Sequence, residues 1–292
     1  MNSKRSDVLR LAVPSKGRIS QPVLELLEKS GLHMSNGKDR RLIAKTCDPH
    51  VEILYARPID IPAYVANGAA DLGITGQDMV RERRADVLEL LDLGIGRARM
   101  VLAVPEEADI TTINDLEGAR IATEFPVITG EYFGEKGIGV SIVPVSGACE
   151  ATPYLGIADA IVDLTSSGTT LETNRLEVLD EILASSTVLI ANRTAYREMS
   201  GKLEEILVAL ESVIRARGQC YLMMNIQRDA LEEVKGLLPG LSGPTVMEVA
   251  SRENLVAVHA VVGEERVYQL INLLKRAGAR DILVIPIERM IR

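Results

Sequence analysis

One stretch decides how this chain folds, and it reads Ala160-Ile161-Val162-Asp163-Leu164-Thr165-Ser166-Ser167-Gly168-Thr169-Thr170-Leu171-Glu172. Its first three residues form a short apolar run of the kind that fills a buried parallel strand. Hydroxyl side chains gathered around one glycine follow directly. The stretch therefore predicts a strand, a tight loop and the start of a helix.

The predicted loop carries the groups that bind an anion. Gly168 lets the backbone approach a ligand closely, and the helix that follows would direct unpaired amide groups at the same place. The hydroxyl donors are those of Thr165, Ser166, Ser167, Thr169 and Thr170. Because no lysine follows Gly168, the loop is not a nucleotide-triphosphate P-loop, and a single phosphate monoester fits it better.

Two interpretations of this stretch stay open. Asp163 ends the strand, where it could accept hydrogen bonds from sugar hydroxyls or face a hydrated magnesium ion, so a ribose 5-phosphate would use both the loop and the acid. Thr169 to Glu172 is also an S/T-x-x-E capping box. A helix needs such a cap whether or not a ligand binds.

The length and composition predict a folded protein of more than one domain. The 292 residues are 47% hydrophobic and 25% charged, which is ordinary for a globular chain long enough for two or three domains. Acidic residues outnumber basic ones by 41 to 33, for a net charge of −8, and aromatic residues make up only 3%. These values argue against a nucleic-acid binder, although a local basic pocket for phosphates remains possible.

Three further classes are not expected. Residues 1–7 are polar and charged, and no run approaches the roughly 18 apolar residues of a membrane span, so we expect neither a secretory signal nor a membrane segment. Cys47, Cys149 and Cys220 are far apart and odd in number, which suggests reduced thiols in a cytoplasmic protein. The three histidines lack metal-ligand spacing, which argues against a zinc site or a Ser-His-Asp triad.

The N-terminal part predicts a second ligand-binding edge. Residues 8–14 read as a strand, and a helix capped by Ser20 and stopped by Gly31 follows. Lys16 and Arg18 lie on the loop between them, which is where open α/β sheets bind ligands. The loop could hold a polyphosphate or be a solvated turn.

A weak internal repeat suggests two similar lobes. Gly68-Ala69-Ala70-Asp71 resembles Gly156-Ile157-Ala158-Asp159, 88 residues later, and each opens a short apolar strand that leaves into a Thr/Gly loop. We expect two α/β lobes whose loops face each other across a cleft. Lobe I is predicted to comprise residues 1–103 and 186–217, and lobe II residues 104–185.

Residues 218–292 have the clearest pattern in the chain. Their strands are predicted at 220–226, 245–250, 255–262 and 282–287, and their helices at 229–238 and 264–277. The resulting order, βαββαβ, specifies a ferredoxin-like domain.

These segments together carry a resemblance to a known family. The block Gly156 to Leu171 is similar to the signature of the ATP phosphoribosyltransferases of histidine biosynthesis. Residues 13–18, 71–78 and 121–126 are similar to other blocks of that family, in the family's order, and residues 237–240 with 244–245 resemble the regulatory domain of its long form. The resemblance implies a catalytic region like the two-lobed periplasmic binding proteins, followed by the ferredoxin-like domain.

The resemblance also implies an activity. Family members condense ATP with phosphoribosyl pyrophosphate in the presence of Mg²⁺, giving N1-phosphoribosyl-ATP and pyrophosphate. Histidine inhibits the long form by binding between subunits of a homo-oligomer, with dimers and hexamers expected. Nitrogen 1 of adenine is already a nucleophile, so the protein must mainly position the substrates and stabilise charge.

Carried over to this chain, the resemblance assigns residues as follows. Asp163 would hold the ribose hydroxyls, and Thr165, Ser166, Ser167, Gly168, Thr169 and Thr170 the 5-phosphate. Glu150 would reach the sugar or Mg²⁺, although a carboxylate at a helix start needs no ligand. Lys16, Arg18 and Arg57 would contact phosphates, Asp78 would make a polar contact with ATP, and Phe125, where the family usually has tyrosine, would stack on adenine. The histidine contacts would be Asn225, Thr245, Val261 and Asp281.

Two alternatives share the two-lobed pattern. A ligand-binding protein of transport or sensing could have the same lobes without any chemistry. Prephenate dehydratases also join two lobes to a small regulatory domain, but they typically show Thr-Arg-Phe where this chain has Thr123-Glu124-Phe125. A glutamate at that place would repel a dicarboxylate substrate.

Overall fold

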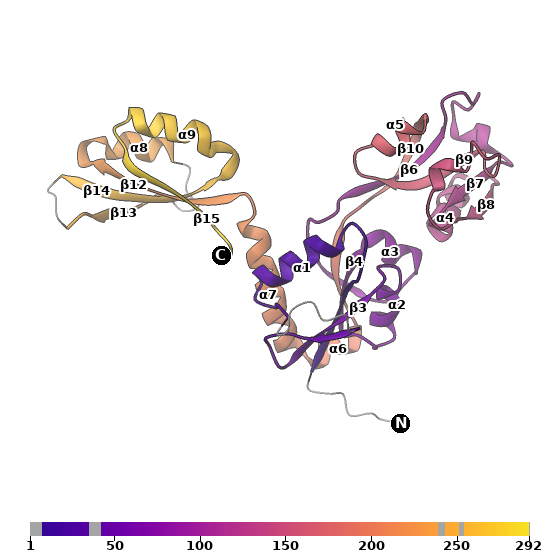
Figure 1. Ribbon diagram of the computed structural model, residues 1–292, viewed down its shortest axis with the longest axis horizontal. Coiled ribbons are helices and arrows are strands. Elements are labelled where there is room, and N and C mark those ends of the chain that lie inside the picture. Colours follow the sequence, from indigo (N-terminus) through magenta and orange to yellow (C-terminus); the bar gives the residue numbers. More distant parts are fainter. Residues whose placement is uncertain (1–7, 35–41, 239–242, 251–253, 292) are drawn as a thin grey trace. The chain divides into compact units, whose positions relative to one another are not determined.

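The computed structural model describes residues 8–34, 42–238, 243–250 and 254–291 (Figure 1). The chain divides into two compact units, residues 1–207 and residues 208–292. Among the described residues, no helix is both long and apolar enough to cross a membrane. Residues 1–7, and Pro239 and Gly240 of the regulatory-domain resemblance, lie outside the described residues.

The first lobe is a six-stranded sheet with helices on it. In spatial order its strands are β2 (Ile43–Lys45), β3 (Val51–Ala56), β1 (Leu9–Pro14), β4 (Leu72–Gly76), β11 (Thr187–Ala191) and β5 (Leu88–Asp92). Strands β3, β1 and β4 run parallel. Its helices are α1 (Ser20–Lys29), α2 (Ile61–Ala66), α3 (Gln77–Glu82), α6 (Arg193–Glu198) and α7 (Ser200–Ala216). Every residue of β4 and β11 is buried, as expected for central strands covered on both faces.

The second lobe is a five-stranded sheet. In spatial order its strands are β10 (Leu176–Ser185), β6 (Ala98–Pro105), β9 (Ala160–Thr165), β7 (Arg120–Thr123) and β8 (Ser141–Pro144). Strand β9 runs parallel to β7 and antiparallel to β6. The lobe also contains α4 (Pro126–Lys136), α5 (Thr169–Thr173) and the short 3-10 helices η1 (Ile113–Leu116) and η2 (Cys149–Ala151).

The chain crosses between the lobes twice. The first crossing is residues 93–97, between β5 and β6, and the second is Ser186, between β10 and β11. The second lobe therefore begins at Ala98, and the predicted boundary after residue 103 is wrong. The reason is that β6 pairs with β9 and β10, and its Met100 and Leu102 fill the second lobe's core. An apolar run does not itself reveal which sheet it joins.

The two lobes otherwise follow the sequence prediction closely. The strands predicted at 8–14, 51–55 and 188–191 and the helix predicted at 199–217 are present within about two residues. Ser20 is not the cap of α1, because it is the first helical residue and its hydroxyl donates to the Pro14 carbonyl over 2.9 Å. Two lobes joined by two crossings confirm the predicted fold of the periplasmic-binding-protein kind.

The second unit is the predicted ferredoxin-like domain. Its strands β13 (Thr245–Glu248), β14 (Leu255–Gly263), β12 (Gln219–Gln227) and β15 (Arg280–Pro286) form an antiparallel sheet in that order. Helices α8 (Leu231–Leu237) and α9 (Glu264–Arg276), with η3 (Arg228–Ala230) before α8, cover one face of it (Figure 1). The compact unit takes in the end of α7, from residue 208, in addition to the predicted residues 218–292. The backbone amide of Met290 donates to the Ser212 carbonyl, which ties the end of α7 to this unit.

A buried carboxylate of the first lobe binds backbone amides of the second. Glu82, in the last turn of α3 in the first lobe, accepts hydrogen bonds from the backbone amides of Val127 and Ile128, at 3.0 and 3.1 Å. These amides belong to the first turn of α4 in the second lobe, where no side chain of the local sequence caps the helix. Glu82 is only 8% exposed, so its charge interacts with the helix N-terminus in a largely water-free place.

Replacing this acid tests how much the contact between the lobes stabilises the protein. Glu82→Ala leaves two amides of α4 without their acceptor, and we expect a loss of about 1 to 3 kcal/mol in the free energy of unfolding. Urea unfolding followed by circular dichroism measures it. The control is Asp86→Ala, which removes an exposed ion pair with Arg193 inside the first lobe and should cost less than about 1 kcal/mol. Equal losses in the two variants would contradict the capping role.

Candidate active site

The hydroxyl-rich loop lies directly after β9, as predicted. The hydroxyl of the buried Thr165 accepts a hydrogen bond from the Gly168 amide at 2.9 Å, and the hydroxyls of Ser167 and Thr169 lie 3.0 Å apart. Gly168 has φ +82°, a left-handed conformation that favours glycine. The loop is therefore a tight turn whose other hydroxyl groups face solvent.

The capping-box interpretation of this loop is wrong. Gly168, and not Thr169, occupies the N-cap position of α5, and no side chain caps the helix. Within the described part of the chain, the hydroxyls of Ser166 and Thr170 make no hydrogen bond to a protein group, and both residues are exposed. These hydroxyl groups remain available to a ligand.

Asp163 is a half-buried carboxylate whose negative charge few protein groups stabilise. Its carboxylate accepts a 2.7 Å hydrogen bond from the Leu164 amide. Burial raises the pKa of Asp163 to about 6; the Leu164 hydrogen bond lowers this pKa, and the nearby charges of Glu124 and Glu150 raise it. A group that donates hydrogen bonds or carries positive charge would therefore bind here favourably.

Asp163 and the two acids near it come from three segments. Glu124 follows β7, whose Thr123 pairs in parallel with Val162 of β9, and Glu150 lies in η2. The Glu124 carboxylate accepts a hydrogen bond from the amide of Gly147, next to Ala148 with its left-handed φ of +49°. The structure thus brings Asp163 and Glu150 together as predicted. It adds Glu124, which the sequence analysis considered only as a mismatch to another family.

Cys149 lies near the acids but is excluded as a nucleophile. Cys149 is 1% exposed, and burial, reinforced by the acid cluster, raises the pKa of its thiol to about 12, so it is no nucleophile. In the described residues, no three acidic, histidine or cysteine side chains converge closely enough to hold a metal ion.

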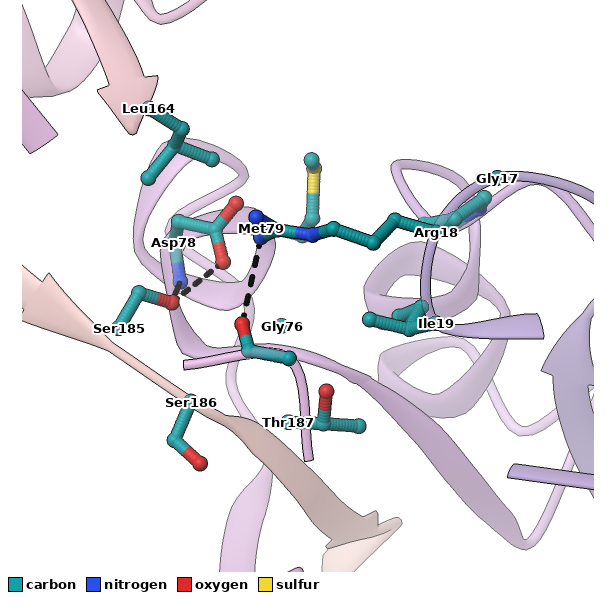
Figure 2. Close-up of a pocket in the computed structure, with 12 residues that line it drawn as sticks. Gly17, Arg18, Ile19, Gly76, Asp78, Met79, Leu164, Ser185, Ser186 and Thr187 are labelled. Carbon is teal, nitrogen blue, oxygen red and sulfur yellow. Dashed lines mark hydrogen bonds between the residues drawn. The ribbon is translucent and has the colours of Figure 1, made fainter. Parts of the chain in front are cut away.

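A cavity of about 210 Å³ lies at the carboxyl ends of the first lobe's strands (Figure 2). Arg18 and Asp78 both line it, together with apolar groups of Ile19, Met79 and Leu164. Figure 2 shows the Arg18 side chain extending toward Asp78, with its guanidinium donating to the Gly96 carbonyl over 3.2 Å. Two of the five predicted ATP-binding residues are therefore neighbours.

Asp78 is held by a serine that the sequence analysis missed. The Ser185 hydroxyl donates to the Asp78 carboxylate over 2.6 Å and accepts from the Asp78 amide (Figure 2). Asp78 is 5% exposed, and burial raises its pKa despite this bond. Gly76 makes room for it, because a side chain there would overlap the Asp78 carboxylate. Ser185 is 107 residues from Asp78, so only the strand order brings them together.

The other three predicted ATP contacts lie outside this cavity. Lys16 and Arg57 are exposed, and Arg57 donates to the Asp60 carboxylate over 2.7 Å, so their phosphate contacts stay predictions. The prediction that Phe125 stacks on adenine is wrong. Its ring is only 2% exposed and packs with Leu116 and Ile128 in the second lobe's core, which leaves no face for a base.

The four predicted histidine contacts share one side of the ferredoxin-like sheet. Asn225, Thr245 and Val261 alternate with the buried residues of their sheet and so lie on the face away from the helices. The Asn225 side-chain amide donates to the Asp281 carboxylate over 2.9 Å, where Asp281 has a left-handed φ of +50°. Thr245 and Val261 lie in other rows of the sheet, opposite His259 and Tyr221.

Comparisons with known proteins agree on one family. The family model for ATP phosphoribosyltransferase matches residues 57–212, and the model for the C-terminal domain of that family matches residues 216–289. An ATP phosphoribosyltransferase of Methanocella arvoryzae is 53% identical over 285 residues, which cover 98% of this chain and 100% of that one. One of Haloarcula marismortui is 55% identical over 285 residues, or 97% of this chain and 100% of that one.

A solved structure is similar over the catalytic region. The ATP phosphoribosyl transferase (HisG:HisZ) complex from Thermotoga maritima contains a chain that is 33% identical, with a TM-score of 0.62. The match covers 70% of this chain and 99% of that one. The resemblance drawn from the sequence is thereby confirmed, and the family match decides against both alternatives.

Asp163→Asn tests whether the half-buried charge is as poorly compensated as the geometry indicates. Above pH 6 the folded wild type holds a charged Asp163, and a pKa raised from 3.8 to about 6 corresponds to at most about 3 kcal/mol of destabilisation. We expect the variant to be more stable than the wild type at pH 8, and the gain to vanish as the pH falls toward 4 and the wild-type group protonates. Thermal unfolding at several pH values measures both effects.

Asp159→Asn is the matched control. Hydrogen bonds from Arg120 lower the pKa of Asp159, so its charge stabilises the folded state above its ordinary pKa, and removing it should not raise stability at pH 8. A wild type that is more stable at pH 8 than Asp163→Asn would contradict our account of Asp163.

Proposed function

This chain belongs to the ATP phosphoribosyltransferase family, and from that premise we propose that it transfers the phosphoribosyl group of phosphoribosyl pyrophosphate to N1 of ATP as the first step of histidine biosynthesis. The observation that carries the proposal is the pairing of Asp163 with the hydroxyl loop that begins two residues later. A ribose 5-phosphate has hydroxyls at one end and an anion at the other. The acid and the loop offer the complementary groups in the same order.

The chemistry follows from this placement. The loop would bind the 5-phosphate through the hydroxyls of Ser166 and Thr170, and the ribose hydroxyls would donate to Asp163. As the bond from C1 to pyrophosphate breaks, its electron pair leaves with the pyrophosphate and the sugar gains oxocarbenium character. The negative charge of Asp163 stabilises this positive charge, and N1 of adenine then forms the new bond to C1.

The adenine would bind in the Asp78 cavity. Its apolar side chains Ile19, Met79 and Leu164 can pack on the ring, and a carboxylate suits the exocyclic amine as a hydrogen-bond acceptor. Ser185 would hold Asp78 in place for this contact. The cavity thus replaces Phe125 in our account of how the base is recognised.

Mg²⁺ fits the acid cluster as a hydrated ion. Glu124 and Glu150 raise the pKa of Asp163, and a nearby cation would relieve this repulsion. Because no three described side chains can ligate a metal directly, these glutamates would contact the waters of an ion carried by the pyrophosphate. When bound, Mg²⁺ would neutralise the charge on the departing pyrophosphate.

The ferredoxin-like domain would bind histidine and join subunits. The Asn225–Asp281 pair offers a carboxylate to an amino group and an amide to a carboxylate. The same face exposes apolar side chains, with Met247 54%, Leu283 51% and Ile285 46% exposed. Exposed apolar side chains on a sheet face suit burial against another subunit, which supports a homo-oligomer, with dimers and hexamers expected.

Turnover and its pH dependence test the proposed reaction. The full-length protein should form phosphoribosyl-ATP and pyrophosphate from ATP, phosphoribosyl pyrophosphate and Mg²⁺. Because Asp163 must be charged, kcat/KM should fall as the pH drops below about 6. Asp163→Asn should lose about 100-fold or more in kcat with both substrates saturating, and its profile should lack this acid limb. Wild-type turnover in Asp163→Asn would remove the acid from the site.

Asp281→Ala tests the histidine site in the intact chain. Loss of the carboxylate should weaken inhibition by histidine about tenfold or more while leaving kcat without histidine unchanged. Initial rates at increasing histidine measure both quantities. Asp229→Ala, in η3 of the same domain, is the control and should be inhibited like the wild type. Unchanged inhibition of Asp281→Ala would place the effector elsewhere.

A further inference from the structure

A second cavity lies beside the first and differs from it in charge. It has a volume of about 470 Å³ and shares Ser185 and Ser186 with the Asp78 cavity. The first cavity has one arginine and one acid, Arg18 and Asp78, whereas this one has two arginines, Arg97 and Arg99, and one acid, Asp92. Ser166 of the hydroxyl loop also borders it, so it adjoins the proposed 5-phosphate site.

Of the two arginines, Arg97 is the one with no ion pair. Arg99 pairs with Glu181 at 3.2 Å. For Arg97, no acidic group of the described residues lies within ion-pair distance, although Asp92 is near enough to interact electrostatically. Asp92 already accepts hydrogen bonds from the Ser186 hydroxyl and, at 2.8 Å, from the Gly94 amide. Both bonds reach the same carboxylate oxygen, Oδ1, so Asp92 is held in place without Arg97.

The backbone that carries Arg97 is fixed. The crossing segment before it is held to the start of β11, because the Leu93 amide donates to the Thr187 carbonyl and the Thr187 amide donates to the Ile95 carbonyl, at 2.9 and 3.0 Å. Leu93 and Ile95 are buried, at 0% and 7% exposure. Arg97 therefore extends an exposed guanidinium, which has no ion pair among the described residues, from an ordered base into the cavity.

We propose that this cavity binds the phosphate chain of a substrate through the guanidinium of Arg97, beside the Ser166 hydroxyl of the 5-phosphate loop. A guanidinium forms two parallel hydrogen bonds to phosphate oxygens. Asp92 repels a bare anion, but the phosphate chains of both proposed substrates are accompanied by Mg²⁺. The inference rests on the proposed function, since it takes the bound chain to be the pyrophosphate of phosphoribosyl pyrophosphate or the triphosphate of ATP.

Binding to the full-length protein tests this site. The probes are inorganic pyrophosphate, ATP and AMP, each with Mg²⁺, titrated by calorimetry into the wild type, Arg97→Ala and Arg97→Lys. We expect Arg97→Ala to weaken binding of pyrophosphate or ATP about tenfold or more, Arg97→Lys to weaken it less, and AMP, which has no phosphate chain, to bind as before. Arg193→Ala, which breaks a pair with the largely exposed Asp86, is the control and should change none of these.

The outcomes of the experiment identify which substrate supplies the bound phosphate chain. A loss confined to pyrophosphate, with a raised KM for phosphoribosyl pyrophosphate, assigns the cavity to the leaving group. A loss confined to ATP, with a raised KM for ATP, assigns it to the triphosphate. Unchanged affinity for both, or an equal loss for AMP, overturns the inference. If the wild type turns over normally in that case, only this inference fails, whereas absence of wild-type turnover would reject the proposed function itself.

Discussion

Asp163 is a carboxylate that the fold keeps partly away from water with one backbone amide to stabilise it. Its charged neighbours are Glu124 and Glu150, and both make its ionisation harder. A structural carboxylate would normally have a cation or several donors around it. In the proposed reaction, a ribose would supply the missing donors, and its C1 would supply positive charge as pyrophosphate departs. The poorly compensated charge of Asp163 would then favour the transition state over the free enzyme.

The strand order explains how the acids converge. Parallel strands β7 and β9 are neighbours, so their carboxyl ends place Glu124 and Asp163 at one edge of the sheet. Glu124 lies two residues before α4, and the first turn of α4 is held by Glu82 of the other lobe. The position of an acid in the second lobe therefore depends on a carboxylate of the first. Residues from both lobes shape one site even where they never touch the substrate.

Local sequence predicted most helices and strands. It did not predict the location of residues whose place depends on which strands become neighbours. The hydroxyl loop could be predicted because apolar strand residues and clustered hydroxyls cannot share one environment. Ser185 and Arg97 could not, because their roles depend on where the chain crosses between sheets. Phe125 was misplaced for a related reason, since an aromatic ring beside a site is equally suited to the core beneath it. Strand β10 was missed because much of it is exposed and charged, unlike a buried strand.

The two cavities meet where the chain changes sheets. Both are lined by Ser185 and Ser186, and their remaining walls include Gly96 and Arg97 of the other crossing. Any change in the angle between the lobes must be absorbed close to Gly96 and Ser186, because residues 93–95 are hydrogen-bonded to β11 and these are the remaining links between the two sheets. A ligand that fills both cavities contacts both links, so its binding free energy differs between lobe arrangements that bring those contacts together and those that do not. Positioning of the substrates and selection of one lobe arrangement would then rest on the same few residues.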